Sequence, residues 1–211
     1  KQAEKAKNSR AVKHYGEFYR KELKRYKKYK KELSSSIDDF NKGITIHESV
    51  HQLCYNSGLL HISDLNPEWL VEGLAMLFED PAVWQGRHVG KGNKQRVESL
   101  ARAIKAGRQI KLVPMVSSQT QLIARRDPHF AYASSWALIH FFIVGKFRKY
   151  KAPFFEYLKG VRAMTKGMTG RKRHSAKEAE TKQLKLFREK FGDVNKLEKE
   201  FRAYVKKLIE K

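Results

Sequence analysis

The sequence predicts a mainly α protein, α+β at most, and two observations support this prediction. Apolar residues recur at three- and four-residue steps through most of the chain, whereas the period-two alternation of a half-buried strand is scarce. The 211 residues, 41% of them hydrophobic, suffice for one domain with a substantial core. We expect a basic N-terminal helix and linker in residues 1–43 and the main domain in residues 44–211, together one compact unit.

The N-terminal segment predicts an amphipathic helix, because apolar residues recur on one helical face with lysines and arginines between them. These residues are Tyr15, Tyr19, Leu23, Tyr26 and Leu33. We expect this face to pack in the core, although aromatic residues interleaved with basic ones also suit nucleic acid. The polar residues 34–43 predict a linker.

Further helices follow from apolar periodicity and from glycine, proline and asparagine signals at their ends. A helix is expected over residues 44–55, and Asn66 is expected to cap a second one that begins at Pro67 and extends to Phe78. The remaining predictions are a loop at 82–94, a helix at 95–106 closed by Gly107, a short strand at 110–116, helices at 129–150 and 154–161, a basic loop at 165–174, and a final helical pair broken at Gly192-Asp193.

The charge of the chain is strongly positive, since 45 lysines and arginines oppose 22 acidic residues and give +23. Such a charge attracts polyanions, including nucleic acid, anionic lipid and acidic polymers, but solvated lysine-rich helix faces are the favoured explanation. Cys54 is the only cysteine, which excludes intramolecular disulfides. No apolar run reaches the length of about 20 residues that a transmembrane helix needs, so no transmembrane segment is expected.

The segment His47-Glu48-Ser49-Val50-His51 matches the pattern H-E-x-x-H. Residues four apart share one face of a helix, so both imidazoles can face one metal ion. Glu48 follows the first histidine and can hold a water molecule at that ion. The pattern therefore predicts a hydrolytic zinc site.

A catalytic zinc ion needs a third protein ligand. The metzincin pattern would place a histidine six residues after His51, with a glycine between, but Ser57 and Cys54 occupy those positions. The other arrangement takes a glutamate from the following helix as the third ligand, and Glu72 fits it. Glu72 lies within the apolar run 69–78, where an unpaired carboxylate is costly to bury. The alternatives left open as ligands are Glu68, Glu79, His61 and Asp64.

Two segments together resemble the gluzincin metallopeptidases, most closely bacterial peptidase-MA-like domains, and more distantly the aminopeptidase-N-like enzymes. They are H-E-x-x-H-Q at 47–52 and P-x-W-L-x-E-G-L-A at 67–75, and weaker likeness extends to residues 130–142 and 191–193. The resemblance implies a zincin-like domain with a signature helix, a second helix that carries the glutamate and a C-terminal helical subdomain. It makes His47, His51 and Glu72 the ligands of one Zn²⁺ and Glu48 the general base.

Related gluzincins use a later tyrosine or histidine to stabilise the oxyanion, and Tyr132 is the candidate here, followed by His129 and His140. They also place a small sheet before the signature helix. Only 46 residues precede His47, so the sheet is small or missing, or an upstream part of the parent protein supplies it. Glu79 and Asp80 are candidates to orient the histidines from outside the ligand set.

The expected function is therefore a zinc-dependent peptidase that acts on proteins or peptides. The alternative is a basic module that uses an inactive zincin scaffold to bind polyanions, and a third option is hydrolysis of a non-peptide amide. The resemblance and the absence of an initial methionine favour an exported bacterial protein. The sequence does not decide between endo- and exopeptidase activity, nor the oligomeric state.

Overall fold

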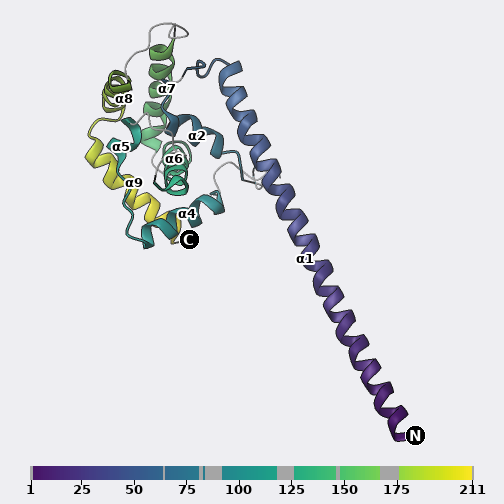
Figure 1. Cartoon of the computed structure of the whole chain (residues 1–211). Helices are drawn as coiled ribbons and strands as arrows, with labels where there is room; N and C mark the ends of the chain where they lie inside the picture. Colours follow the sequence, from purple (N-terminus) through teal and green to yellow (C-terminus); the bar gives the residue numbers. More distant parts are fainter. Residues whose placement is uncertain are drawn as a thin grey trace. The chain divides into compact units, whose positions relative to one another are not determined.

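The computed structural model describes residues 2–63, 65–80, 83, 92–117, 126–145, 148–166 and 176–210, with the backbone alone described for 2–16, 148 and 176–180 (Figure 1). This part of the chain is mainly helical and contains no strand, so the mainly α prediction is confirmed. The helices are α1 (Gln2–Asn56), α2 (Glu68–Met76), α4 (Lys94–Lys105), α5 (Leu112–Ser117), α6 (Pro128–Ile143), α7 (Lys151–Thr165), α8 (Ala176–Phe191) and α9 (Val194–Ile209), with a 3-10 turn at Arg148–Tyr150. None of these described helices combines the length and apolar character that a bilayer crossing requires.

The chain divides into two compact units, Lys1–Lys42 and Gly43–Lys211. Every described residue of the first unit is helical, and so is Gly43, so the linker predicted at residues 34–43 is wrong. No glycine or proline occurs between residues 17 and 42 to end the helix. The serine hydroxyls also fit a helix, as Ser36 Oγ donates to the Glu32 carbonyl 2.9 Å away, one turn earlier.

The apolar face of this first unit is exposed to solvent. Tyr19, Leu23, Tyr26 and Leu33 all belong to the exposed residues, so the prediction that they pack in the core is wrong. The side chain of Tyr15 lies outside the described residues. The periodicity identified the helix correctly, but periodicity alone does not say which surface covers its apolar face.

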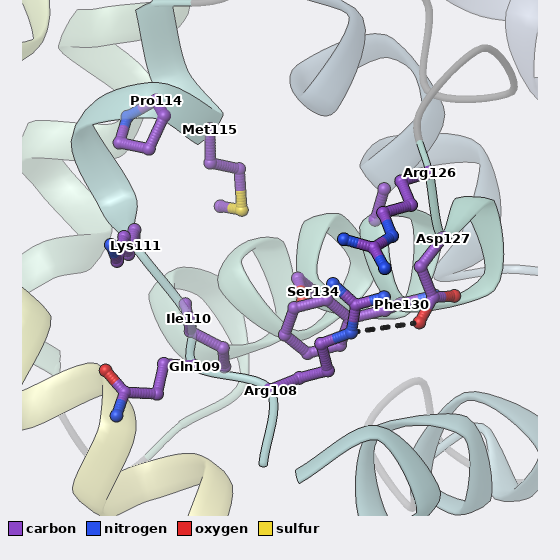
Figure 2. A pocket seen from close by; sticks show the side chains of 11 residues that line it. Arg108, Gln109, Ile110, Lys111, Pro114, Met115, Arg126, Asp127, Phe130 and Ser134 are labelled. Carbon is purple, nitrogen blue, oxygen red and sulfur yellow. Dashed lines mark hydrogen bonds and ion pairs between the residues drawn. The ribbon is translucent and has the colours of Figure 1, made fainter. Parts of the chain in front are cut away.

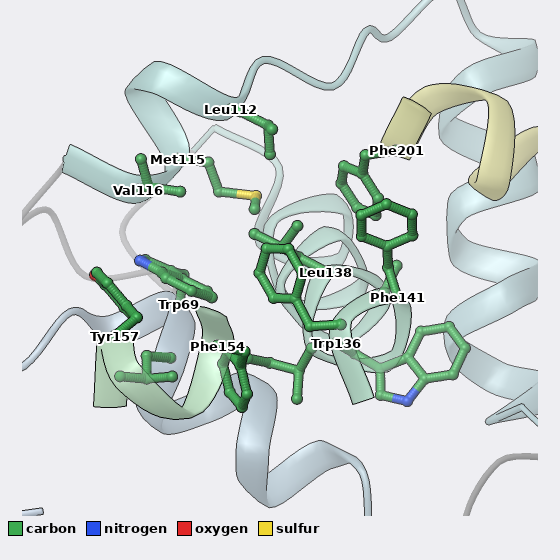
Figure 3. Packing of buried hydrophobic residues seen from close by; sticks show 14 of the residues in the cluster. Trp69, Leu112, Met115, Val116, Trp136, Leu138, Phe141, Phe154, Tyr157 and Phe201 are labelled. Carbon is green, nitrogen blue, oxygen red and sulfur yellow. The ribbon is translucent and has the colours of Figure 1, made fainter. Parts of the chain in front are cut away.

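The second unit is built around α6, against which α2, α4, α7 and α9 pack (Figure 1). Every residue of α6 from Ala133 to Phe142 is buried, as expected of a helix that is covered on all sides. Aromatic rings fill much of this core, and the Phe142 and Phe191 rings stack with centroids 4.5 Å apart. Figure 3 shows Trp69 beside Tyr157, with their ring centroids 5.8 Å apart.

Several boundaries differ from the sequence-based expectations. The expected strand at 110–116 is replaced by α5, whose first N–H, from Leu112, donates to Glu198 Oε2 at 2.7 Å. A short buried apolar run suits either structure, and periodicity does not separate them. The expected helix at 129–150 ends at Ile143, before Gly145. The expected loops at 82–94 and 165–174 lie largely outside the described residues.

The start of α2 also differs from the prediction. Asn66 does not cap the helix, because its side-chain amide donates to the His61 carbonyl at 2.7 Å. Pro67 occupies the cap position, and its carbonyl accepts from the N–H groups of Leu70 and Val71. Other end signals are confirmed: Gly107 and Gly192 follow α4 and α8 with φ of 82° and 74°, the left-handed conformation that glycine adopts without strain.

Candidate metal centre

Two histidines face each other across one turn of α1. His47 and His51 lie four residues apart, and their Nε2 atoms are 3.0 Å from each other. The rings meet edge to face, with centroids 4.6 Å apart. Both side chains are largely buried, and they belong to the part of α1 within the second unit. The spacing of the motif therefore directs both nitrogens to one point.

Glu72 of α2 completes this cluster. Its Oε2 lies 3.1 Å from His47 Nε2, and its Oε1 lies 3.6 Å from His51 Nε2. The neighbouring Gly73 explains how α2 is positioned, because a Cβ there would stand 2.6 Å from Ile139 Cγ1 and 2.9 Å from the Ser135 carbonyl oxygen. Only glycine permits this contact between α2 and α6, and the contact fixes the part of α2 that carries Glu72.

The three side chains offer one ligand atom each, and these atoms all lie within 4.8 Å of one another. With metal–ligand bonds of about 2.0–2.1 Å, the ligand atoms of a tetrahedral zinc site lie about 3.3 Å apart. The two imidazole Nε2 atoms are 3.0 Å apart, and the Glu72 carboxylate approaches them through Oε2, 3.1 Å from His47, and Oε1, 3.6 Å from His51, all close to that value. Two imidazole nitrogens and a carboxylate oxygen are also a donor set that zinc accepts. The residues therefore fit a single zinc ion.

Glu79 lies behind His47 and orients it. Its Oε1 is 2.7 Å from His47 Nδ1, the ring nitrogen that faces away from the cluster. Arg96 of α4 holds the same carboxylate, with Nη2 3.0 Å from Oε1 and 2.8 Å from Oε2. Asn93 adds a longer contact of 3.4 Å from its side-chain amide. Such a partner fixes the tautomer and direction of a metal-binding histidine. Glu79 therefore contacts the cluster from outside and is not a member of the His47, His51 and Glu72 group.

The charges around His47 shift its acid–base behaviour. Burial favours the neutral ring, but hydrogen bonds to Glu72 and Glu79, together with their charges, outweigh burial and raise the pKa of His47 to about 9. Burial would raise the pKa of Glu79, yet its hydrogen bonds and charge interactions with His47 and Arg96 lower it. At neutral pH a metal ion that binds His47 therefore displaces a proton.

Glu48 and Tyr132 lie beside the cluster in different surroundings. Glu48 is exposed and has no hydrogen bond or ion pair to the described residues, so its carboxylate is accessible to water. Tyr132 is half-buried, and Arg96 lies 5.9 Å from the centre of its ring. Burial raises the pKa of Tyr132, and so do the charges of Glu72 and Glu68, so its hydroxyl stays protonated.

The other sequence candidates do not join this cluster. His129 is exposed at the start of α6. His140 is buried and hydrogen-bonds through Nδ1 to the Tyr204 hydroxyl, which makes it a core histidine. His61 is half-buried outside the group of ligand atoms, and Asp64 lies outside the described residues. The pocket of about 270 Å³ in Figure 2, lined by residues such as Arg108, Arg126 and Phe130, contains none of the predicted site residues.

Sequence reasoning missed Arg96 and did not assign Glu79. Arg96 lies in the first turn of α4, in a chain with 45 lysines and arginines, so nothing in the sequence separates it from solvated neighbours. Its contact with Glu79 becomes apparent only once α2 and α4 have both packed against α6. Glu79 follows α2 by three residues, where helix periodicity no longer predicts a direction.

We expect Glu79→Gln to weaken zinc binding by about 10- to 100-fold, because the amide is a weaker partner for His47 and loses the Arg96 ion pair. The affinity is measured by competition with a chromophoric chelator. The control is Glu98→Gln, at an exposed glutamate of α4 that lies 3.9 Å from Lys94 Nζ. Equal affinities of the two variants would rule out the orienting role of Glu79.

The fold and the site together define a mainly helical protein with a His-His-Glu cluster suited to one metal ion. The model of a family described as "Protein of unknown function (DUF1570)" matches residues 42–164, more than half of the chain. The chain therefore belongs to this family. The matched segment contains the three cluster residues together with Glu48, Glu79, Arg96 and Tyr132. No curated protein and no solved structure matches the chain.

Proposed function

We propose that this protein is a zinc-dependent metallopeptidase of the gluzincin type, which hydrolyses peptide bonds in proteins or peptides. The observation that supports the proposal is the convergence of His47 Nε2, His51 Nε2 and the Glu72 carboxylate at 3.0–3.6 Å. These are the residues that the H-E-x-x-H pattern and the segment around Glu72 predict. An exposed Glu48 directly after the first histidine adds a base where the reaction needs one.

In this proposal His47, His51 and Glu72 hold the ion, and Glu79 with Arg96 keeps His47 in a fixed orientation. A bound zinc ion supplies a Lewis acid that acidifies water and polarises the scissile carbonyl. Glu48 accepts the proton of the attacking water and later delivers it to the leaving amine. Tyr132, kept protonated by its raised pKa, donates a hydrogen bond to the developing oxyanion.

The described residues offer no strand to pair with the substrate backbone. The proposed function therefore specifies peptide-bond hydrolysis but no particular substrate sequence. An exported location also stays a prediction.

The test is hydrolysis of a quenched fluorescent protein substrate and of a peptide library by protein stripped with a chelator. We expect no activity in the stripped protein, recovery on addition of zinc, and one zinc ion per chain by elemental analysis. His51→Ala should prevent recovery, while His129→Ala, at an exposed histidine on α6, should not. A chain that takes up no stoichiometric metal would overturn the proposal. Salt-dependent binding to a polyanion without hydrolysis would favour the inactive, basic module.

A further inference from the structure

A heptad-spaced stripe runs along the exposed face of α1 within the first unit. Its positions alternate in steps of four and three, the spacing of a coiled-coil seam. The seam consists of Tyr19, Leu23, Tyr26, Lys30, Leu33, Ile37 and Phe40. Its six apolar members are between 38% and 68% exposed. Large apolar side chains at this spacing over about three heptads predict a helical partner rather than solvent.

We propose that a second copy of this chain covers the seam, and that the two copies of α1 pair antiparallel about a two-fold axis between residues 31 and 32. The seam of a coiled coil contains two kinds of heptad position, a and d. In an antiparallel pair each a position packs against a d position of the partner helix. In this register Leu23 lies opposite Phe40 of the second copy, and Tyr26 lies opposite Ile37. Lys30 lies opposite Leu33. Because of the two-fold axis, each of these pairs occurs twice in the dimer.

The sizes of the side chains fit this register. The Leu23–Phe40 and Tyr26–Ile37 layers each oppose an aromatic ring with an aliphatic side chain, so neither layer brings two aromatic rings together. A parallel pair would place Tyr26 against Tyr26 and Phe40 against Phe40. It would also bury Lys30 against Lys30, two like charges in one layer.

The charges along α1 favour the same arrangement. Residues 20–31 contain eight lysines and arginines and one glutamate, a net charge of +7, whereas residues 32–42 contain three acidic residues and one lysine, a net charge of −2. An antiparallel pair brings each basic half beside the acidic half of the other copy. A parallel pair would bring the two +7 halves together, and like charges in contact are unfavourable.

The residues that flank the seam on one side bring no like charges together in this register. On one side these flanking positions are Arg20, Lys27, Ser34 and Asn41. The antiparallel register places Arg20 near Asn41 of the second copy and Lys27 near Ser34, so no like charges oppose each other there. The acidic residues Asp38 and Asp39, and Lys30 within the seam, count against a membrane surface, which an amphipathic helix meets with an uninterrupted basic polar face.

The oligomeric state of the full chain tests the pairing, by sedimentation equilibrium. We expect a dimer for the native chain and a monomer for Ile37→Asp, which puts a charge into a seam layer. The matched control is Ser35→Asp, the same charge on the outer side of the helix, which should remain dimeric. Zinc content should be the same in both variants, so failure of the pairing is distinguishable from failure of the proposed function.

Cysteine crosslinking tests the direction, in a Cys54→Ser background. A mixture of Leu23→Cys and Phe40→Cys chains should form disulfide-linked heterodimers, while neither variant alone should crosslink. Crosslinking of each variant with itself would show a parallel pair and overturn the proposal. A monomeric native chain would overturn it as well, whether α1 then binds an acidic helix, nucleic acid or anionic vesicles.

Discussion

Glu48→Gln is expected to lower the rate of peptide hydrolysis by about two to four orders of magnitude while zinc stays bound at one ion per chain. Glutamine keeps the shape of the side chain but does not accept a proton from the attacking water. Glu48 is not a member of the His-His-Glu cluster, so the substitution should spare the metal. The expected loss is in kcat, with little change in KM, because the proton moves only in the reaction itself.

Steady-state kinetics and elemental analysis of the same preparations measure both quantities. Glu32→Gln is the matched control, since Glu32 is an exposed glutamate in the first unit whose carboxylate lies 3.8 Å from Lys28 Nζ. The control should hydrolyse substrate at the native rate. If Glu48→Gln did so too, Glu48 would not be the base.

Glu72→Ala is expected to have the largest effect on metal content. It leaves two imidazole ligands in place of three ligands, so zinc affinity should fall by more than the roughly 10- to 100-fold expected for an orienting residue such as Glu79. Dialysis against buffer without zinc should then leave the variant without stoichiometric metal and without activity. The native chain should retain its ion under the same conditions.

Glu68→Ala is the informative comparison, because Glu68 lies one turn earlier on α2 and was an alternative ligand in the sequence. It should keep zinc. The reverse result, with metal lost from Glu68→Ala and retained by Glu72→Ala, would mean that the ion is bound by a different set of residues.

The sequence predicted the helical class because apolar periodicity is a local property that survives folding. The ends of α4 and α8 were predictable for the same reason, as glycine marks each of them. The predictions that failed needed information from distant parts of the chain. The buried run at 110–116 suits a strand or a helix until Glu198 supplies a partner for its first N–H group. The apolar face of the first unit looked like a core face because spacing does not reveal exposure.

The candidate site shows the same division. His47 and His51 were identified by their spacing, and Glu72 by its place in the apolar run 69–78 and by the family resemblance. The structure brings these three residues together, and their role as zinc ligands stays a prediction. The outer contacts were not deducible, because Glu79 and Arg96 meet only after α2 and α4 have both packed against α6. In a chain with 45 lysines and arginines, composition also does not distinguish Arg96 from the others.

The close contact at Gly73 links two properties of the protein, its thermal stability and the geometry of the His-His-Glu cluster. Any larger side chain there must push α2 away from Ser135 and Ile139, and the displacement would carry Glu72 away from the imidazoles. Enlarging residue 73 should therefore never lower thermal stability without also loosening the hold on metal. At position 73, a substitution that disturbs the packing of the core therefore also disturbs the cluster.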